Sequence, residues 1–195
     1  GVTSFFGVFY LASIGYFGDM PDFRQLENPK TNFASEIISS DNKVLGKYYF
    51  NDNRTPIEYE EINPETINAL IAIEDERFYS HPGIDLKATL RAIVFLNQRG
   101  GASTITQQLA RQLFVGVRSR NIFQAVTQKI KEWVIAVRLE KQYTKEEILT
   151  MYLNIYDFGY YGDGIKSASN IYFSKEPIDL KTEESAMLIG MLQNS

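Results

Sequence analysis

The sequence contains no cysteine and only one histidine, His81, among its 195 residues. The absence of cysteine excludes disulfide bonds and thiolate metal sites. A single histidine excludes most zinc sites and any mechanism that needs two imidazole groups. The formal net charge of −4 gives no general reason to expect a nucleic-acid partner. Positive charge for binding a phosphate must therefore come from a local cluster of lysine and arginine.

Charged side chains are also absent from the first part of the chain, Gly1 to Gly18. A membrane-spanning helix needs roughly 20 apolar residues, with a lower limit of about 17. Tyr10, Tyr16 and Phe17 are aromatic residues of the kind that gather at membrane interfaces. We predict that residues 1–18 form the C-terminal part of a transmembrane segment. A buried core helix or the remnant of a signal peptide is the alternative.

Residues 19–33 are polar and contain proline, which predicts a connector, and residues 34–195 are expected to form one globular domain. The chain is 44% hydrophobic and 23% charged, as expected for a globular domain with a core. Two short strands are predicted at 36–38 and 44–50, around a turn at 41–42. The remaining pattern is helical, so the fold class is mainly α. The helices are predicted over 64–80 (capped by Asn63), 86–97, 103–114 (capped by Ser103), 121–141, 144–154 (with a Thr144/Glu147 capping box) and from 182.

Glu74 falls within an apolar stripe of the first predicted helix, formed by Ile67, Leu70, Ile71 and Phe78. A glutamate is rarely buried without a partner, because its ionised form loses strong water contacts. Desolvation favours the neutral form of a carboxyl group, which suits proton transfer. Alternatively, Glu74 reaches the edge of the helix or pairs with Arg77. Asp75 lies about 100° further round the helix, where it can hold His81 or cap a backbone group.

A second group of polar side chains follows the glycine-containing turn that ends at Ser103. The start of a helix offers free N–H groups and a positive dipole end, which favour an anion. Hydroxyl, amide and guanidinium groups share one face here, at Thr104, Gln107, Gln108 and Arg111. This face suits a phosphate or a polar sugar, and a solvated surface is the alternative.

A third group lies on the long predicted helix, where Glu132 stands beside Lys129 and Lys131. The helix is apolar on two sides, with one stripe at Val126, Ile130, Trp133 and Val137 and another at Gln128, Glu132, Ile135 and Leu139. Such a helix is usually central to its domain, so Glu132 is expected to be partly buried. A salt-bridged surface face is the alternative. Two semi-buried glutamates are typical of glycoside-processing enzymes, and the nearby cations indicate an anionic leaving group.

These segments resemble, in order, the five motifs of the penicillin-binding-protein glycosyltransferase family. The resembling segments are EDERFYSHPG at Glu74–Gly83, GASTITQQLAR at Gly101–Arg111, Lys129–Glu132, Tyr152–Phe173 and Leu180–Gln193. The sequence departs from the pattern at Gln128, where arginine is more usual, and at Gln112, where asparagine is usual. Arg118 and Arg120 are candidates to supply the missing positive charge.

The resemblance implies a lysozyme-like helical fold with a small membrane-associated jaw beside the cleft. It implies an enzyme on the outer face of the bacterial cytoplasmic membrane that polymerises lipid II into glycan strands. Glu74 would be the general base on the acceptor 4-hydroxyl, which attacks the donor with inversion and expels undecaprenyl pyrophosphate. Glu132 would be the second catalytic carboxylate. The substrate-binding residues implied are Asp75, His81, Ser103, Thr104, Gln107, Gln108, Arg111, Arg118, Lys129 and Lys131.

The resemblance also bears on cofactors and partners. It implies no tightly bound cofactor, and Glu132 would act either through the neighbouring lysines or through a Mg²⁺ or Mn²⁺ ion near the donor pyrophosphate. The expected partners are lipid II, the growing glycan strand, the bilayer and other proteins of cell-wall synthesis, and no nucleic acid. The phosphoglycolipid moenomycin, which imitates the donor, is the expected inhibitor.

Two other functions fit parts of the sequence. A lysozyme-like hydrolase or lytic enzyme would share the fold and a catalytic glutamate. It would not need cations around Arg111 and Lys131, because its leaving group is a neutral sugar. A catalytically silent membrane scaffold would not need Glu74 in an apolar stripe.

Overall fold

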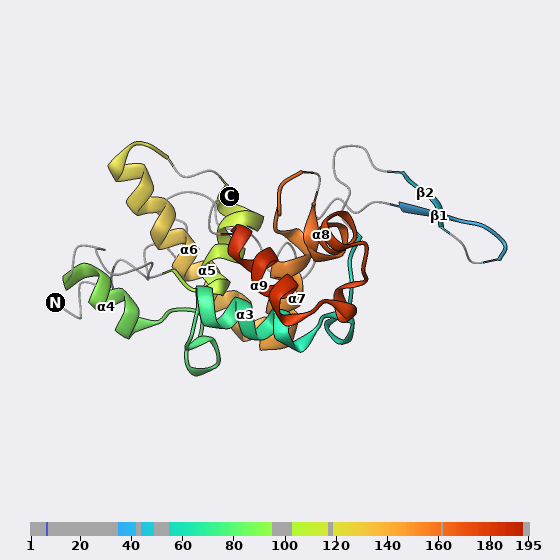
Figure 1. The fold of residues 1–195 in the computed structure, drawn as a ribbon. Helices are drawn as coiled ribbons and strands as arrows, with labels where there is room; N and C mark the ends of the chain where they lie inside the picture. The colour runs from blue at the N-terminus through green and yellow to red at the C-terminus, as the bar shows by residue number, and fades with distance from the viewer. Residues whose placement is uncertain are drawn as a thin grey trace. The chain divides into compact units, whose positions relative to one another are not determined.

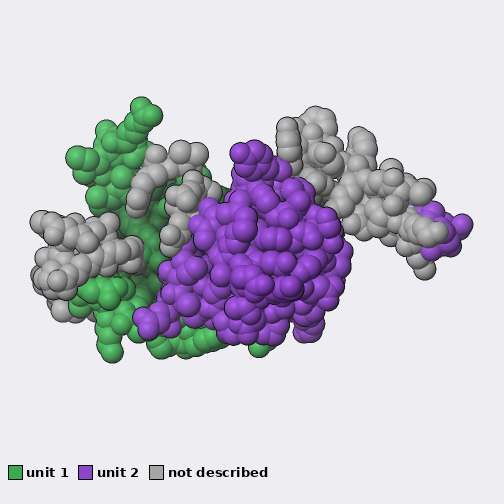
Figure 2. All heavy atoms as spheres, viewed as in Figure 1, with its two compact units in different colours: residues 1–30, 77–148 green, residues 31–76, 149–195 purple. Residues whose placement is uncertain are grey.

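The computed structural model describes residue 7 and residues 35–41, 44–48, 55–94, 103–116, 119–160 and 162–192. These residues are mainly helical with two short strands, as predicted (Figure 1). The chain divides into two compact units (Figure 2): unit 1 holds residues 1–30 and 77–148, and unit 2 holds residues 31–76 and 149–195. Apart from Gly7, the predicted membrane segment and connector lie outside the described residues. Among the helices of the described ranges, none has the length and apolar character to cross a membrane.

Unit 2 contains the predicted hairpin. Strand β1 (Ser35–Ile38) pairs antiparallel with β2 (Val44–Tyr48), and Ser35 lies opposite Tyr48. The register is irregular between Ile37 and Ile38. Such an irregularity increases the local twist of a two-stranded ribbon.

The core of unit 2 is built on α3 (Pro64–Glu74), which packs against α9 (Thr182–Met191). Asn63 caps α3 as predicted: its side-chain oxygen accepts a hydrogen bond from the Glu65 N–H at 2.8 Å. Its amide nitrogen donates to the carbonyls of Ile178 (2.9 Å) and Leu180 (2.7 Å). One side chain therefore both starts α3 and attaches it to the segment that leads into α9.

The predicted end of the first helix, near residue 80, is wrong, because α3 ends at Glu74. Asp75 leaves the helical region, with φ −159° and ψ 73°, and Phe78–Ser80 forms a separate 3-10 helix. Phe78 belongs to unit 1 and is fully buried there. Its apolar character is therefore explained without extending α3 to residue 78. Glu74 is consequently the last residue of the helix, half-buried, and not the middle of an apolar stripe.

Unit 1 is built on α6 (Ile122–Gln142), which packs against α5 (Ile105–Ala110). The side-chain oxygen of Asn121 caps α6 by accepting from the N–H groups of Phe123 and Gln124. Of the two apolar stripes of α6, the one that contains Glu132, Ile135 and Leu139 is buried. The other stripe is exposed at Val126 and half-buried further along.

Unit 1 also contains α4 (Leu86–Val94) and a π-helical turn (Arg111–Val115), and the residues of α7 (Lys145–Ile155) are divided between the two units. Helix α4 begins at the predicted residue, and α5 continues into the π-helical turn. Helix α7 begins in unit 1 and ends in unit 2. Its predicted capping box is present, since the Thr144 N–H donates to Glu147 (2.7 Å) and the Glu147 N–H to Thr144 (3.2 Å).

The sequence prediction missed α8 (Gly164–Phe173) and placed one cap wrongly. A glycine at the start of α8 obscures that start in the sequence: Gly164, the first residue of the helix, has φ +78°, and a Cβ there would lie 2.5 Å from the Asn154 carbonyl oxygen. Small residues on its buried face weaken the apolar periodicity that would reveal it. The cap of α5 is Thr104 and not Ser103, because the Thr104 hydroxyl accepts from the Gln107 N–H at 3.1 Å.

We predict that Asn63→Ala lowers the free energy of unfolding by about 2–3 kcal/mol, because a cap and two further hydrogen bonds are lost. Asn63→Ser keeps a capping oxygen and should lower it by less. Urea unfolding of the chain in detergent measures both values. Equal losses for the two variants would show that the cap contributes nothing.

Candidate active site

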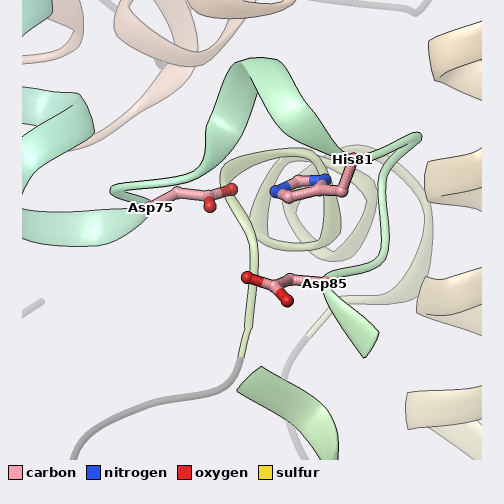
Figure 3. A group of neighbouring side chains, drawn as sticks. All are labelled: Asp75, His81 and Asp85. Atoms are coloured by element: carbon pink, nitrogen blue, oxygen red, sulfur yellow. The ribbon is translucent and has the colours of Figure 1, made fainter. Parts of the chain in front are cut away.

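Glu74 and Asp75, the first two residues of the first motif, lie at the end of α3 in unit 2. Glu74 is half-buried and is the last helical residue. Asp75 is buried, and its N–H donates to the Ile71 carbonyl at 3.1 Å, so it stands at the C-cap position of α3. Figure 3 shows the Asp75 side chain leaving the end of this helix.

Residues 77–83 of the first motif belong to unit 1, where a short loop carries His81 and leads into α4 (Figure 3). His81 is buried, and its ring meets the Phe78 ring edge to face, with centroids 6.4 Å apart. A ring nitrogen of His81 and a carboxylate oxygen of Asp85 lie within 4.8 Å of each other. The loop therefore places the imidazole beside a buried carboxylate.

Asp85, which sequence reasoning missed, holds this loop together. Its Oδ2 accepts from Arg77 Nε (2.8 Å) and Nη2 (2.6 Å), and its Oδ1 accepts from the Ala88 N–H (2.9 Å). Burial acts to raise the pKa of Asp85, but the hydrogen bonds from Ala88 and Arg77 and the charges of Arg77 and His81 outweigh it, so the pKa lies below its ordinary value. The position of an aspartate directly before a helix start was the available signal.

The second and third motifs meet in unit 1 through Lys129. Its ammonium group donates to Ser103 Oγ at 2.7 Å and to Glu132 Oε2 at 2.8 Å. Only 4% of the Glu132 side chain is exposed, so its predicted burial is confirmed. Lys129 thus neutralises a buried carboxylate and connects α6 to Ser103, the residue before the cap of α5.

Thr104 and Gln107, which belong to the predicted polar face, are buried as well, so the alternative of a solvated surface does not hold for these two side chains. The Thr104 hydroxyl donates to the Gly83 carbonyl at 2.7 Å, and Gln107 Nε2 donates to the same carbonyl at 3.3 Å. Both side chains are therefore used inside unit 1. Gln108 and Arg111, which share the predicted face, are half-buried.

A cavity of about 380 Å³ lies in unit 1 beside α6 and the π-helical turn. Lys131 is half-buried and lines it. The other lining residues are mostly apolar or amides: Phe114, Val115, Phe123, Gln124, Thr127, Gln128 and Ile135. A cation at the wall of a partly apolar cavity suits a ligand with an anionic group and an apolar part. Arg118, also predicted for this site, lies outside the described residues.

The comparisons with known proteins agree with the motifs. A family model described as Transglycosylase matches residues 41–195, so the chain belongs to the transglycosylase family. The chain is 36% identical over 195 residues to penicillin-binding protein 1A of Vibrio cholerae, covering 98% of this chain and 22% of that protein. It is 36% identical over 176 residues to penicillin-binding protein 1A of Escherichia coli, covering 88% and 20%.

A third relative is penicillin-binding protein 1F of Bacillus subtilis, 40% identical over 162 residues that cover 81% of this chain and 22% of that protein. The predicted membership, as the glycosyltransferase domain of a class A penicillin-binding protein, is confirmed. The chain spans about a fifth of the length of these curated relatives.

We predict that the stabilising effect of Asp85 disappears in acid. Its pKa is lower in the folded than in the unfolded chain, so folding releases a proton and is favoured above the ordinary value of 3.8. Asp85→Asn should therefore unfold more easily than the parent at neutral pH, and the gap should close as the pH falls through the folded pKa. Urea unfolding from about pH 6 to about pH 2 tests this, and a gap that stays constant would contradict it.

Proposed function

We propose that the chain polymerises lipid II into glycan strands by inverting glycosyl transfer, with release of undecaprenyl pyrophosphate. Membership of the transglycosylase family supports the class of reaction. The observation that carries the proposal is the pair of lysines on α6 next to the buried Glu132: Lys129 lies 2.8 Å from its carboxylate, and Lys131 precedes it in the chain and lines the cavity. A pyrophosphate leaving group is multiply charged, whereas the leaving group of a hydrolase is a neutral sugar.

Lys129 and Lys131 have different parts in this proposal. Lys129 is held by Glu132 and Ser103, so its charge has a fixed position before any substrate arrives. Lys131 lines the cavity, which supports a contact with the donor, and Arg111 and Gln108 are the further proposed donor contacts. Cations fixed in advance stabilise developing charge without reorganisation during the reaction.

Glu74 is the proposed general base. Its carboxylate takes the proton of the acceptor 4-hydroxyl as that oxygen bonds to the anomeric carbon of the donor. The bond from this carbon to the pyrophosphate oxygen breaks, and the electron pair leaves with the pyrophosphate. Half-burial supports this role, because such a carboxylate is both accessible and partly desolvated. Asp75 and His81 are proposed to support the acceptor side.

A divalent cation fits this site poorly. Mg²⁺ and Mn²⁺ take oxygen ligands, preferably carboxylates that are free to coordinate. Glu132 is already paired with an ammonium group at 2.8 Å. We therefore assign the electrostatic role to the lysines and propose no tightly bound cofactor.

The proposed setting is the outer face of the bacterial cytoplasmic membrane, with a lysozyme-like fold and a membrane-associated jaw. Apolar side chains on the first turns of α6 support a jaw of this kind, since Ile122 is 82%, Phe123 77% and Val126 54% exposed. Residues 1–18 are the proposed anchor. Other proteins of cell-wall synthesis are the proposed partners.

Glu74→Gln keeps the shape of the side chain and removes the base. We expect the turnover of lipid II to fall by at least ~10²-fold while the melting temperature stays close to that of the parent. Glu76→Gln, at an exposed position two residues on, is the control and should keep full turnover. Near-parental turnover in Glu74→Gln would remove the base assignment.

Lys131→Ala should lower turnover by roughly 10²-fold, because a cation that meets the leaving pyrophosphate acts mainly on the transition state. It should also weaken moenomycin binding, since that inhibitor presents a phosphate.

Arg111→Lys should lower turnover less than Arg111→Ala does, because the charge survives. Lys141→Ala, at an exposed position on the same helix as Lys131, is the control. A hydrolase would be favoured if the parent cleaved a phosphate-free glycan and if Arg111→Ala and Lys131→Ala cleaved it at the same rate.

A further inference from the structure

The loop that carries His81 lies against α6 in unit 1 at a single glycine. Gly83 has φ +88°, and a Cβ at this position would lie 2.8 Å from the Ala136 carbonyl oxygen. The obstacle is the backbone of a helix, which cannot move aside as a flexible side chain can. Only glycine allows this approach.

Side chains from two helices hold the carbonyl groups of the same loop. Lys145 Nζ, at the start of α7, donates to the His81 carbonyl at 2.8 Å. Thr104 and Gln107, at the start of α5, donate to the Gly83 carbonyl. Three side-chain donors and the close approach of Gly83 to the backbone of α6 therefore fix residues 81–83.

Lys145 is itself held from several sides. Its ammonium group lies 2.7 Å and 2.8 Å from the two carboxylate oxygens of Glu140, and 4.2 Å from the centre of the Phe78 ring. Only 5% of the Glu140 side chain is exposed, and Glu140 Oε1 also accepts from the Thr106 hydroxyl at 2.5 Å. A buried ion pair is weak evidence for added stability, because desolvation offsets much of the attraction. Its fixed geometry, in contrast, suits a positioning role.

We propose that Lys145 is a positioning residue of the transfer reaction: with Glu140 it holds the His81 carbonyl and thereby sets the place of the His81 imidazole. Thr104 and Gln107 act in the same clamp, because they are 2% and 0% exposed and already bind the loop. This inference rests on the proposed function for its catalytic consequence. Its structural part, the control of His81 by Lys145, does not depend on that function.

The single histidine makes the structural part directly measurable. The full chain is prepared without a histidine tag and with isotope-labelled histidine. The imidazole C–H signals in its NMR spectrum can then come only from His81. Lys145→Met keeps most of the apolar side chain and removes the ammonium group. We expect it to shift and broaden the His81 signals, Lys145→Arg to restore them largely, and Lys141→Met, at an exposed neighbouring position, to leave them unchanged.

The kinetic part uses lipid II as the substrate. Lys145→Met should lower kcat about 10-fold with little change in KM, since a displaced group near the reacting atoms affects the transition state most. Lys145→Met and His81→Ala should be non-additive, because both act through the same imidazole. A role in stability alone predicts a lower melting temperature with normal kcat per folded molecule.

The inference is overturned if Lys145→Met leaves the His81 signals unchanged. It is also overturned if the fold-loss of kcat in the double variant equals the product of the fold-losses in Lys145→Met and His81→Ala. If Lys145→Met does not fold, Thr106→Val takes its place, since it removes one contact that holds Glu140, and the same two readouts decide. A parent chain with no activity on lipid II would reject the proposed function, while the NMR comparison still decides whether Lys145 positions His81.

Discussion

Glu132 is a carboxylate with 4% of its side chain exposed, and the ammonium group of Lys129 lies 2.8 Å away from it. Removing one partner of such a pair typically costs about 3–5 kcal/mol, because the other charge is left buried and uncompensated. Lys129 also binds Ser103, so the pair connects α6 to the start of α5. Positive charge at this place is therefore required by the fold as well as by the proposed chemistry.

The elements around Lys129 in unit 1 determine which other side chains lie near this part of α6. Packing between α5 and α6 places Lys131 at the wall of a cavity and leaves Arg111 half-buried. Gly83 allows the loop with His81 to lie directly on α6, and the Lys145–Glu140 pair holds that loop. The fixed charge of Lys129 and the position of Lys131 at the cavity support the proposed phosphate-bearing donor, whereas a neutral leaving group makes no such demand.

Local signals in the sequence predicted the features that depend on neighbours in the chain. The caps at Asn63 and Thr144 and the burial of Glu132 could be predicted, because each follows from spacing along one helix. The end of α3 could not, since the burial of Phe78 in unit 1 overrides the periodicity. The contact from Lys145 to the His81 carbonyl joins residues 64 positions apart, and no local pattern reveals such a contact.

The central claim is that the cations around Glu132 serve a transfer reaction with a pyrophosphate leaving group. The most direct measurement is to incubate the full chain with lipid II in detergent, separate the products, and treat any polymer with lysozyme. The account predicts glycan strands that lysozyme digests, formed together with undecaprenyl pyrophosphate. Cleavage of a phosphate-free glycan by a chain that leaves lipid II unchanged would contradict it.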